Sequence, residues 1–327
     1  MNAKTLCLLL ALTPVLAAGI EPVDRKAKMT YTEASASQEL EKADAIFQAR
    51  DYEKALEAYT DVVEIARKEF NRSVETEALS QVARMNLILN GPEAGREWLD
   101  KAAERADDAD PMGWSRYLGV KGRFEWKADN LKAARATFDD MYTYCNTNGL
   151  WGRAVDAAHM IAIVATNPKE QITWSYRGIE AAESAGEEHW LGPLWNNMAI
   201  TYYDQKNYDS ALTCFLKARE YHWRHSGEIG KLFADYHVGM TYRQLGNYDE
   251  AASWLRPVLA WAERLNHHSA IGQACEDLGE VMVAQGKKSD GLQLLKRARE
   301  EYKTARFDEQ LPEIWKKLND RIAELES

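Results

Sequence analysis

Apolar and small side chains recur along this chain at the three- and four-residue steps that place them on one face of an α-helix. The pattern is clearest over residues 193–223, where two predicted helices each carry three such side chains. They are Trp195, Ala199 and Tyr202 on the first helix and Ala211, Phe215 and Ala218 on the second. Residues 205–209 between them are mostly polar and predict a turn. This stretch therefore predicts a helix-turn-helix unit.

A small or apolar residue near the start of each predicted second helix recurs at a nearly constant interval. These residues are Ala55, Ala94, Ala134, Ile172, Ala211, Ala251 and Gly291, at successive differences of 39, 40, 38, 39, 40 and 40. Unrelated helices have no reason to keep a common period, so seven units of one kind are expected over residues 36–311. The units around Ala94 and Ile172 depend mainly on this spacing, which leaves their register open by a residue or two.

The two ends of the chain differ from the repeats. Residues 1–19 combine Lys4, an apolar run over 6–12 and small residues at 15–19, which predicts a cleaved signal peptide and a periplasmic location. Residues 20–35 are polar and predict a linker or arm. Residues 312–327 predict an amphipathic helix that caps the last repeat. No other stretch is apolar over the length of a membrane span, so the mature chain is not expected to span a membrane.

Charge and cysteine content narrow the function. With 41 Lys and Arg against 51 Asp and Glu, the formal net charge is -10 and no long basic run occurs, so nucleic acid is not expected as a partner. Of the 4 cysteines, Cys7 lies in the predicted signal peptide. Cys145, Cys214 and Cys275 remain, and buried thiols are expected for Cys214 and Cys275 from their helix positions. One disulfide among the three is the alternative.

The motif of residues 195–218, together with DYEKALEAY at 51–59 and NYDEAASWL at 247–255, resembles the tetratricopeptide repeat. Ala199 stands where that family usually has Gly, and the period near 39 or 40 resembles its extended units. The resemblance implies an all-α, right-handed superhelical solenoid of helix-turn-helix repeats with a C-terminal capping helix. It also implies that the first helix of each repeat faces a concave surface.

Carried onto this sequence, the family's inner positions predict an apolar and aromatic groove. The residues expected to contact a ligand or partner there are Trp126, Ile161, Val164, Ile200, Tyr203, Phe233, Tyr236, Met240 and Arg243. In the fourth unit, Ala154, Ala157 and Ala165 are expected beside Ile161 and Val164. Arg116, Arg123 and Lys127 are expected to form a basic rim. Because most inner positions are apolar, the Lys and Asn clamp with which some family members hold a terminal carboxylate is not expected.

These features favour a non-enzymatic binding or scaffold protein that recruits a protein or peptide partner, for instance of a cell-envelope complex. A carrier of an apolar, lipid- or sterol-like ligand between membranes is the alternative use of such a groove. A third possibility is that Phe233, Tyr236 and Met240 only pack between neighbouring helices. No catalytic residue, cofactor or metal is predicted, because no G-x-S-x-G, Walker or zincin motif occurs and His222 with His225 lacks a third ligand.

Overall fold

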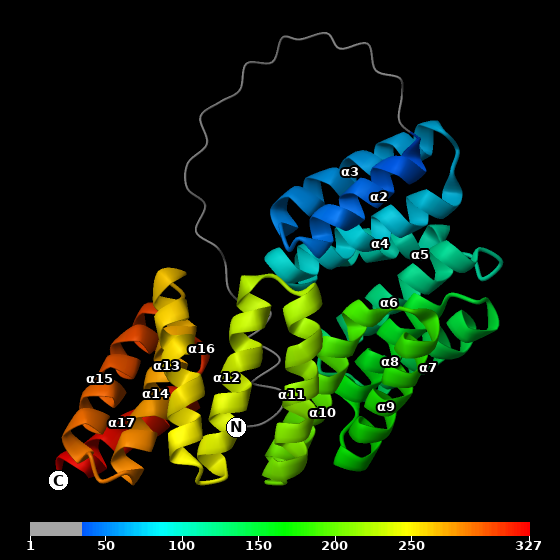
Figure 1. Cartoon of the computed structure of the whole chain (residues 1–327). Coiled ribbons are helices and arrows are strands. Elements are labelled where there is room, and N and C mark those ends of the chain that lie inside the picture. The colour runs from blue at the N-terminus through cyan, green and yellow to red at the C-terminus, as the bar shows by residue number, and fades with distance from the viewer. Residues whose placement is uncertain (1–34) are drawn as a thin grey trace. The chain divides into compact units, whose positions relative to one another are not determined.

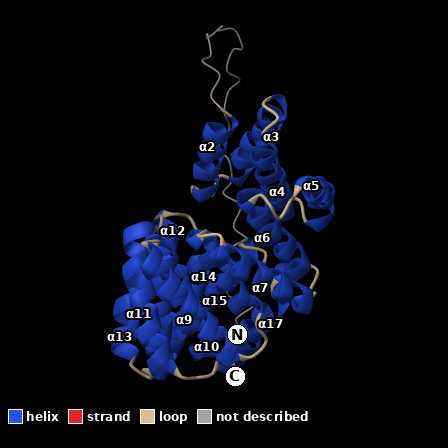
Figure 2. Ribbon diagram, turned by 90° about the vertical axis from the view of Figure 1, so that its right-hand side faces the viewer, coloured by secondary structure: helices blue, strands red, loops and turns tan. Residues whose placement is uncertain are grey.

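The computed structural model describes residues 35–327, and all regular structure in that range is helical (Figure 2). The predicted signal peptide and residues 20–34 of the predicted arm lie outside the described residues. The described chain divides into two compact units, which we name the N-terminal unit (residues 35–185) and the C-terminal unit (residues 186–327). Within residues 35–327, no helix combines the length and apolar character needed to cross a bilayer.

Within residues 36–304, long helices follow one another in seven pairs, and the two helices of each pair are joined by a short connection and pack against each other (Figure 1). The N-terminal unit holds α2 (Ala36–Gln48) with α3 (Tyr52–Lys68), α4 (Arg72–Leu89) with α5 (Pro92–Arg105), α6 (Pro111–Lys127) with α7 (Leu131–Thr147), and α8 (Trp151–Val164) with α9 (Pro168–Ala185). The C-terminal unit holds η1 (Glu188–Trp190), α10 (Leu191–Asp204) with α11 (Tyr208–His225), α12 (Glu228–Gln244) with α13 (Tyr248–Arg264), α14 (His268–Ala284) with α15 (Lys288–Thr304), α16 (Phe307–Gln310) and α17 (Pro312–Glu326).

Asparagine side chains begin several of these helices. Asn71, Asn130 and Asn207 accept the backbone N–H of Val74, Ala133 and Ser210 at 3.2, 3.2 and 3.3 Å. Each bond satisfies a donor that the first helical turn leaves free, which typically stabilises a helix by about 1 kcal/mol. The residue before each of these caps has a positive φ: 55° at Phe70, 58° at Asp129 and 61° at Lys206. The same turn geometry therefore recurs along the chain.

The register of the second and fourth pairs differs from the prediction by one residue. In the other five pairs, the small residue that recurs at the constant interval in the sequence is the fourth residue of the second helix, as Ala55 is in α3. In α5 that place belongs to Gly95, whereas Ala94 is exposed. Gly95 is required there because an added Cβ would lie 2.6 Å from the Ala83 carbonyl oxygen. In α9 the fourth residue is Gln171, not Ile172, because the helix begins at Pro168.

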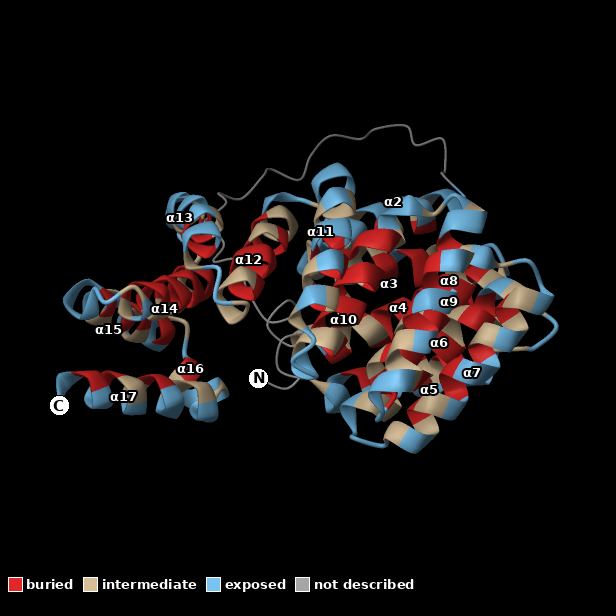
Figure 3. Cartoon of the chain, turned by 60° about the horizontal axis from the view of Figure 1, so that its bottom comes forward, coloured by how far each residue is buried: buried red, intermediate tan, exposed pale blue. Residues whose placement is uncertain are grey.

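The last helix covers the end of the C-terminal unit. α17 packs on α15 and buries Leu318, Ile322 and Leu325 along the side that faces it (Figure 3). Arg321 adds two hydrogen bonds, at 2.9 and 3.0 Å, to the Glu280 carboxylate of α14. α17 thus covers apolar surface of the seventh pair and presents its charged side to solvent.

The cysteines of the described chain are packing residues. Cys145, Cys214 and Cys275 are buried free thiols, so burial is confirmed for Cys214 and Cys275 and no disulfide joins the three. Burial raises the pKa of Cys145 to about 12 and those of Cys214 and Cys275 to about 11. A thiol with a pKa this high holds little reactive thiolate at neutral pH.

Candidate functional site

Three of the predicted site residues meet around one carboxylate in the C-terminal unit. The Tyr236 hydroxyl donates to Asp277 Oδ2 at 2.6 Å, and Arg243 Nε donates to Asp277 Oδ1. Burial, and after it the charge of Asp277, raise the pKa of Tyr203 of α10 above its ordinary value. We call Tyr203, Tyr236, Arg243 and Asp277 the tyrosine-aspartate cluster. The bonds from Tyr236 and Arg243 to Asp277 tie the first helices α12 and α14 together.

Asp277 was not predicted as part of the site. It is 4% exposed, and both of its oxygens are used, so it holds Arg243 and Tyr236 in place rather than offering an acceptor to a ligand. Its sequence signal is weak, because Asp277 is one of three acidic residues in α14, and only its separation of 41 residues from Tyr236, roughly one period, sets it apart. Next to it, Tyr302 donates to Glu276 at 2.7 Å, and burial raises the pKa of Glu276 to about 6.

Most of the predicted apolar contact residues are buried between helices. Ile200, Phe233 and Met240 are 3%, 5% and 3% exposed. Phe233 contacts neighbouring rings edge-on, with its centroid 6.3 Å from Tyr236 and 5.7 Å from His267. The structure thus supports packing for Phe233 and Met240, the role that the sequence left open beside ligand contact, and Ile200 is buried as well.

In the N-terminal unit, Ile161 and Val164 are also buried, in the core that α8 shares with its neighbours. Ala154, Ala157 and Ala165 are buried as well. The predicted register of α8 is therefore off by one residue, and Arg153 and Asp156 take the places expected for Ala154 and Ala157. Trp126 is half-buried and packs beside the same core, with the Lys127 ammonium 5.0 Å from its ring centroid.

Charged side chains from four first helices meet in the N-terminal unit. We call them the charged ladder: Asp44 of α2, Glu77 and Arg84 of α4, Arg116 and Arg123 of α6, and Arg153 and Asp156 of α8. Arg116 donates to Asp44 at 3.0 Å and to Glu77 at 3.2 Å. Arg153 also donates to Glu77, and Arg123 donates to Asp156 at 2.6 Å. The basic rim predicted from Arg116 and Arg123 is therefore corrected to a ladder of alternating charge.

Further polar groups hold this ladder in place. The Tyr59 hydroxyl donates to Asp44 Oδ1 at 2.5 Å, and Gln81 donates to the Tyr59 hydroxyl at 2.8 Å. Burial alone would raise the pKa of Asp156, but the Arg123 and Arg84 guanidinium groups lower it to about 2. Asp156 is therefore ionised at neutral pH, and charge-assisted hydrogen bonds hold the ladder together. Such an array can bind polar and charged groups of another chain.

A buried histidine in the C-terminal unit makes stability depend on pH. His237 is 2% exposed beside Phe215, and burial, with His222 adding to it, lowers its pKa from 6.5 to about 3. Between these two values the unfolded chain binds a proton that the folded chain does not. The free energy of unfolding should therefore fall as pH falls from 6.5 to 3, by up to about 1.4 kcal/mol per pH unit.

We expect His237→Phe to reduce this fall in the free energy of unfolding at acidic pH. The measurement is the urea dependence of unfolding at pH 4 and pH 7 for wild type and variant. Glu276 acts in the opposite direction, because its raised pKa favours the folded state as pH falls from about 6 to 4.5. It is present in both proteins, so the comparison isolates His237. If the free energy of unfolding changed equally with pH in the two proteins, the lowered pKa of His237 would be contradicted.

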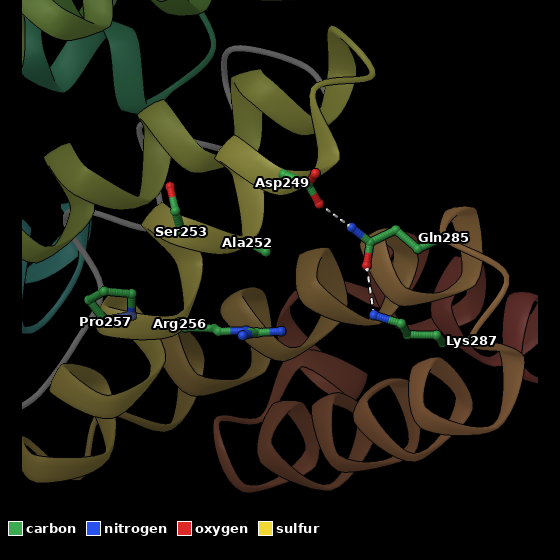
Figure 4. Close-up of a pocket in the computed structure, with 7 residues that line it drawn as sticks. All are labelled: Asp249, Ala252, Ser253, Arg256, Pro257, Gln285 and Lys287. Carbon is green, nitrogen blue, oxygen red and sulfur yellow. Dashed lines mark hydrogen bonds between the residues drawn. The ribbon is translucent and has the colours of Figure 1, made fainter.

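Two open pockets in the C-terminal unit are lined by both polar and apolar side chains. One of about 440 Å³ lies between α13 and the turn from α14 to α15, where Gln285 donates to Asp249 at 2.8 Å and accepts from Lys287 at 3.4 Å (Figure 4). Another of about 470 Å³ mixes four aliphatic side chains with Arg256, Asp290, Gln293 and Arg297. Neither is the enclosed apolar cavity that a lipid carrier requires. Among residues 35–327, no three His, Cys, Asp or Glu residues are grouped to hold a metal ion.

Repeated pairs of helices define an all-α helical-repeat protein. Proteins of this class bind through extended surfaces formed by successive repeats. Two tetratricopeptide-repeat family models match residues 192–222 and 232–304, which are the fifth pair and the sixth and seventh pairs. The chain is therefore a tetratricopeptide-repeat protein. No protein of curated function matches the sequence significantly.

Solved structures share the fold at low sequence identity. A signal-transduction ATPase with numerous domains from Pyrococcus horikoshii, which carries a tetratricopeptide-repeat sensor, matches 86% of this chain at 17% identity and a TM-score of 0.68, and the chain spans 44% of that protein's chain. The apo form of RapI matches 82% of this chain and 77% of its own, at 14% identity and a TM-score of 0.66. Aspartyl phosphate phosphatase F from Bacillus subtilis matches 85% of this chain and 77% of its own, at 13% identity and a TM-score of 0.51. These identities support the fold alone.

Proposed function

We propose that this chain is a non-enzymatic binding protein that recruits a protein or peptide partner through the first helices of its pairs. The observation that carries the proposal is the charged ladder. Its side chains come from four consecutive first helices and stay partly accessible, with Arg116 21% and Asp44 29% exposed. A polypeptide can match such a row of alternating donors and acceptors with its own side chains and backbone.

Among the predicted contact residues, we propose as contacts those whose side chains are partly accessible. Trp126, Tyr203 and Arg243 are part-exposed and belong to first helices. A lipid-like ligand is the weaker proposal, because the apolar side chains that would line its site are buried in packing. The similarity to a protein with a tetratricopeptide-repeat sensor is consistent with recognition by this fold.

We further propose that recruitment takes place in the periplasm, with a partner from a cell-envelope complex. This rests on the positive residue, apolar run and small residues of positions 1–19. Amino-terminal sequencing of the chain isolated from its own cells tests it, with a start near residue 20 as the expected result and an intact Met1 as the contrary one.

Site-specific photo-crosslinking tests the binding face. A benzophenone amino acid replaces Trp126 or Tyr203 on the first helices, or Tyr176 on α9, where a side chain 45% exposed provides the control. Each change keeps an aromatic ring, so folding should survive. We expect discrete adducts in native extracts from positions 126 and 203 but not from 176. Adducts from position 176 alone, or from none of the three, would contradict the proposal.

A further inference from the structure

Three tryptophans gather on the second helices α11 and α13 of the C-terminal unit. The guanidinium carbon of Arg219 lies over two of their rings, 5.0 Å from the centroid of Trp223 and 5.0 Å from that of Trp254. The centroids of Trp223 and Trp261 are 6.0 Å apart. We call Arg219, Trp223, Trp254 and Trp261 the tryptophan platform. It belongs to second helices, so it is separate from the first-helix residues of the proposed function.

Polar contacts hold this platform in a fixed geometry. The Trp223 indole N–H donates to Asp235 Oδ1 of α12 at 2.9 Å, and Arg219 Nε donates to the same oxygen at 2.6 Å. Both bonds link α11 to α12, and α12 also packs against α13. A ring that is already fixed loses little conformational freedom when a ligand binds, and tryptophan is accordingly common among the residues that dominate binding energy.

The platform is accessible to solvent in spite of its apolar rings. Trp223 is 42% exposed although its N–H is bonded, so its exposed surface is largely that of the ring. Leu216, two helical turns earlier on the same side of α11, is 40% exposed. A role in packing α11 against α13 alone would favour burial of Trp223. Clustered apolar side chains that stay exposed instead mark interaction sites.

Hydrogen-bond donors outnumber acceptors on this surface. The indole N–H groups of Trp254 and Trp261 are accessible to water and have no hydrogen-bond partner within residues 35–327. Lys231 adds an ammonium group 5.8 Å from the Trp223 centroid. Asp235 is the carboxylate of the platform, and its Oδ1 already accepts two bonds. A ligand that fits this surface therefore brings apolar faces and acceptors, and few donors.

We propose that the tryptophan platform binds a proline-rich segment of another polypeptide in the polyproline II conformation. Proline has a backbone carbonyl but no backbone N–H, so such a segment offers acceptors and leaves no donor unpaired. Its pyrrolidine rings pack on aromatic side chains, and its helix is formed before binding, so little entropy is lost. The Trp223 ring packs on a pyrrolidine, while Trp254 and Trp261 donate to carbonyl oxygens. This is a second binding surface, beyond the proposed function.

Isothermal titration calorimetry of the full chain tests the platform with three probes. They are acetylated and amidated decaproline, an acetylated and amidated Gly-Ser decapeptide, and maltohexaose, whose hydroxyl groups bring many donors. We expect decaproline to bind and the other two not to bind. Trp223→Ala should weaken the binding of decaproline at least about tenfold, because it removes the exposed ring. Trp261→Phe keeps a ring but removes a donor, and it should weaken binding about threefold to tenfold.

Trp151→Ala is the matched control, because Trp151 is 54% exposed but belongs to the first helix α8 of the N-terminal unit. Its affinity for decaproline should equal that of wild type. The assignment is overturned if wild type does not bind decaproline, if the Gly-Ser peptide binds as tightly, if maltohexaose binds in preference, or if Trp223→Ala changes nothing. Crosslinking from positions 126 and 203 is a separate measurement, so failure here leaves the proposed function standing.

A variant that keeps all the rings separates binding from a role in folding. The double variant Trp254→Phe with Trp261→Phe removes both accessible donors, and its phenyl ring at position 254 still attracts Arg219. Its Tm should stay close to that of wild type, and its affinity for decaproline should be lower than that of Trp261→Phe alone. Unchanged affinity would overturn the proposal even if Trp223→Ala failed to fold.

Discussion

Replacing Asp277 with alanine is expected to lower the free energy of unfolding of the C-terminal unit by about 3 kcal/mol. The substitution removes the acceptor for both Arg243 and Tyr236, and it leaves a guanidinium group with 24% of the side chain exposed without a counter-charge. The partial exposure of Arg243 places the effect at the lower end of the range for broken buried pairs. Urea unfolding, with hydrogen exchange over α12 and α14 to localise the loss, is the measurement.

The control for Asp277→Ala is Asp249→Asn, on the surface of the same unit, where the carboxylate accepts from Gln285. This change should alter stability by less than about 0.5 kcal/mol. The double variant Asp277→Leu with Arg243→Met should recover part of the loss, because it removes both charges together. Similar effects for Asp277→Ala and Asp249→Asn would contradict the view that Asp277 ties the first helices together.

Glu77→Gln should have the largest effect in the N-terminal unit, a loss of about 3–5 kcal/mol. The Glu77 side chain is 4% exposed and accepts from both Arg116 and Arg153. A glutamine keeps the volume but removes the charge, which leaves these two guanidinium groups with Asp44 as their only carboxylate in the ladder. Hydrogen exchange should accelerate in α4, α6 and α8, with α12 and α14 as the internal reference.

Glu64→Gln is the matched control for Glu77→Gln. Glu64 also pairs with an arginine, Arg67 at 3.0 Å, but its side chain is 61% exposed, so water replaces the lost bond and the change should be below about 0.5 kcal/mol. Equal stabilities of the two variants would mean that solvent screens the ladder as it screens the surface.

The helical character of the fold and the pairing of helices could be predicted from the sequence because both depend on local signals. Apolar residues at steps of three and four fix which face of each helix is buried, and the small residues at Ala55, Ala134, Ala211, Ala251 and Gly291 mark where second helices begin. Asparagine caps set helix starts within a few residues. None of these signals requires knowledge of a distant neighbour.

Register was predicted less well where a local rule had two acceptable solutions. Gly95 and Ala94 are both small, and only the approach of the Ala83 backbone selects the residue without a Cβ. The inner face of α8 shows the same ambiguity. Its alanines and Ile161 could have faced inward by spacing alone, and the packing around Cys145 and Trp174 decides that they lie in the core.

The sequence by itself determined a chain of paired helices of nearly constant period, because helix formation and turn geometry depend on residues a few positions apart. Only the tertiary structure decided which charges meet. Asp44 and Arg116 are 72 residues apart, Glu77 and Arg153 are 76 apart, and Arg243 and Asp277 are 34 apart. Their contacts depend on how successive first helices pack side by side.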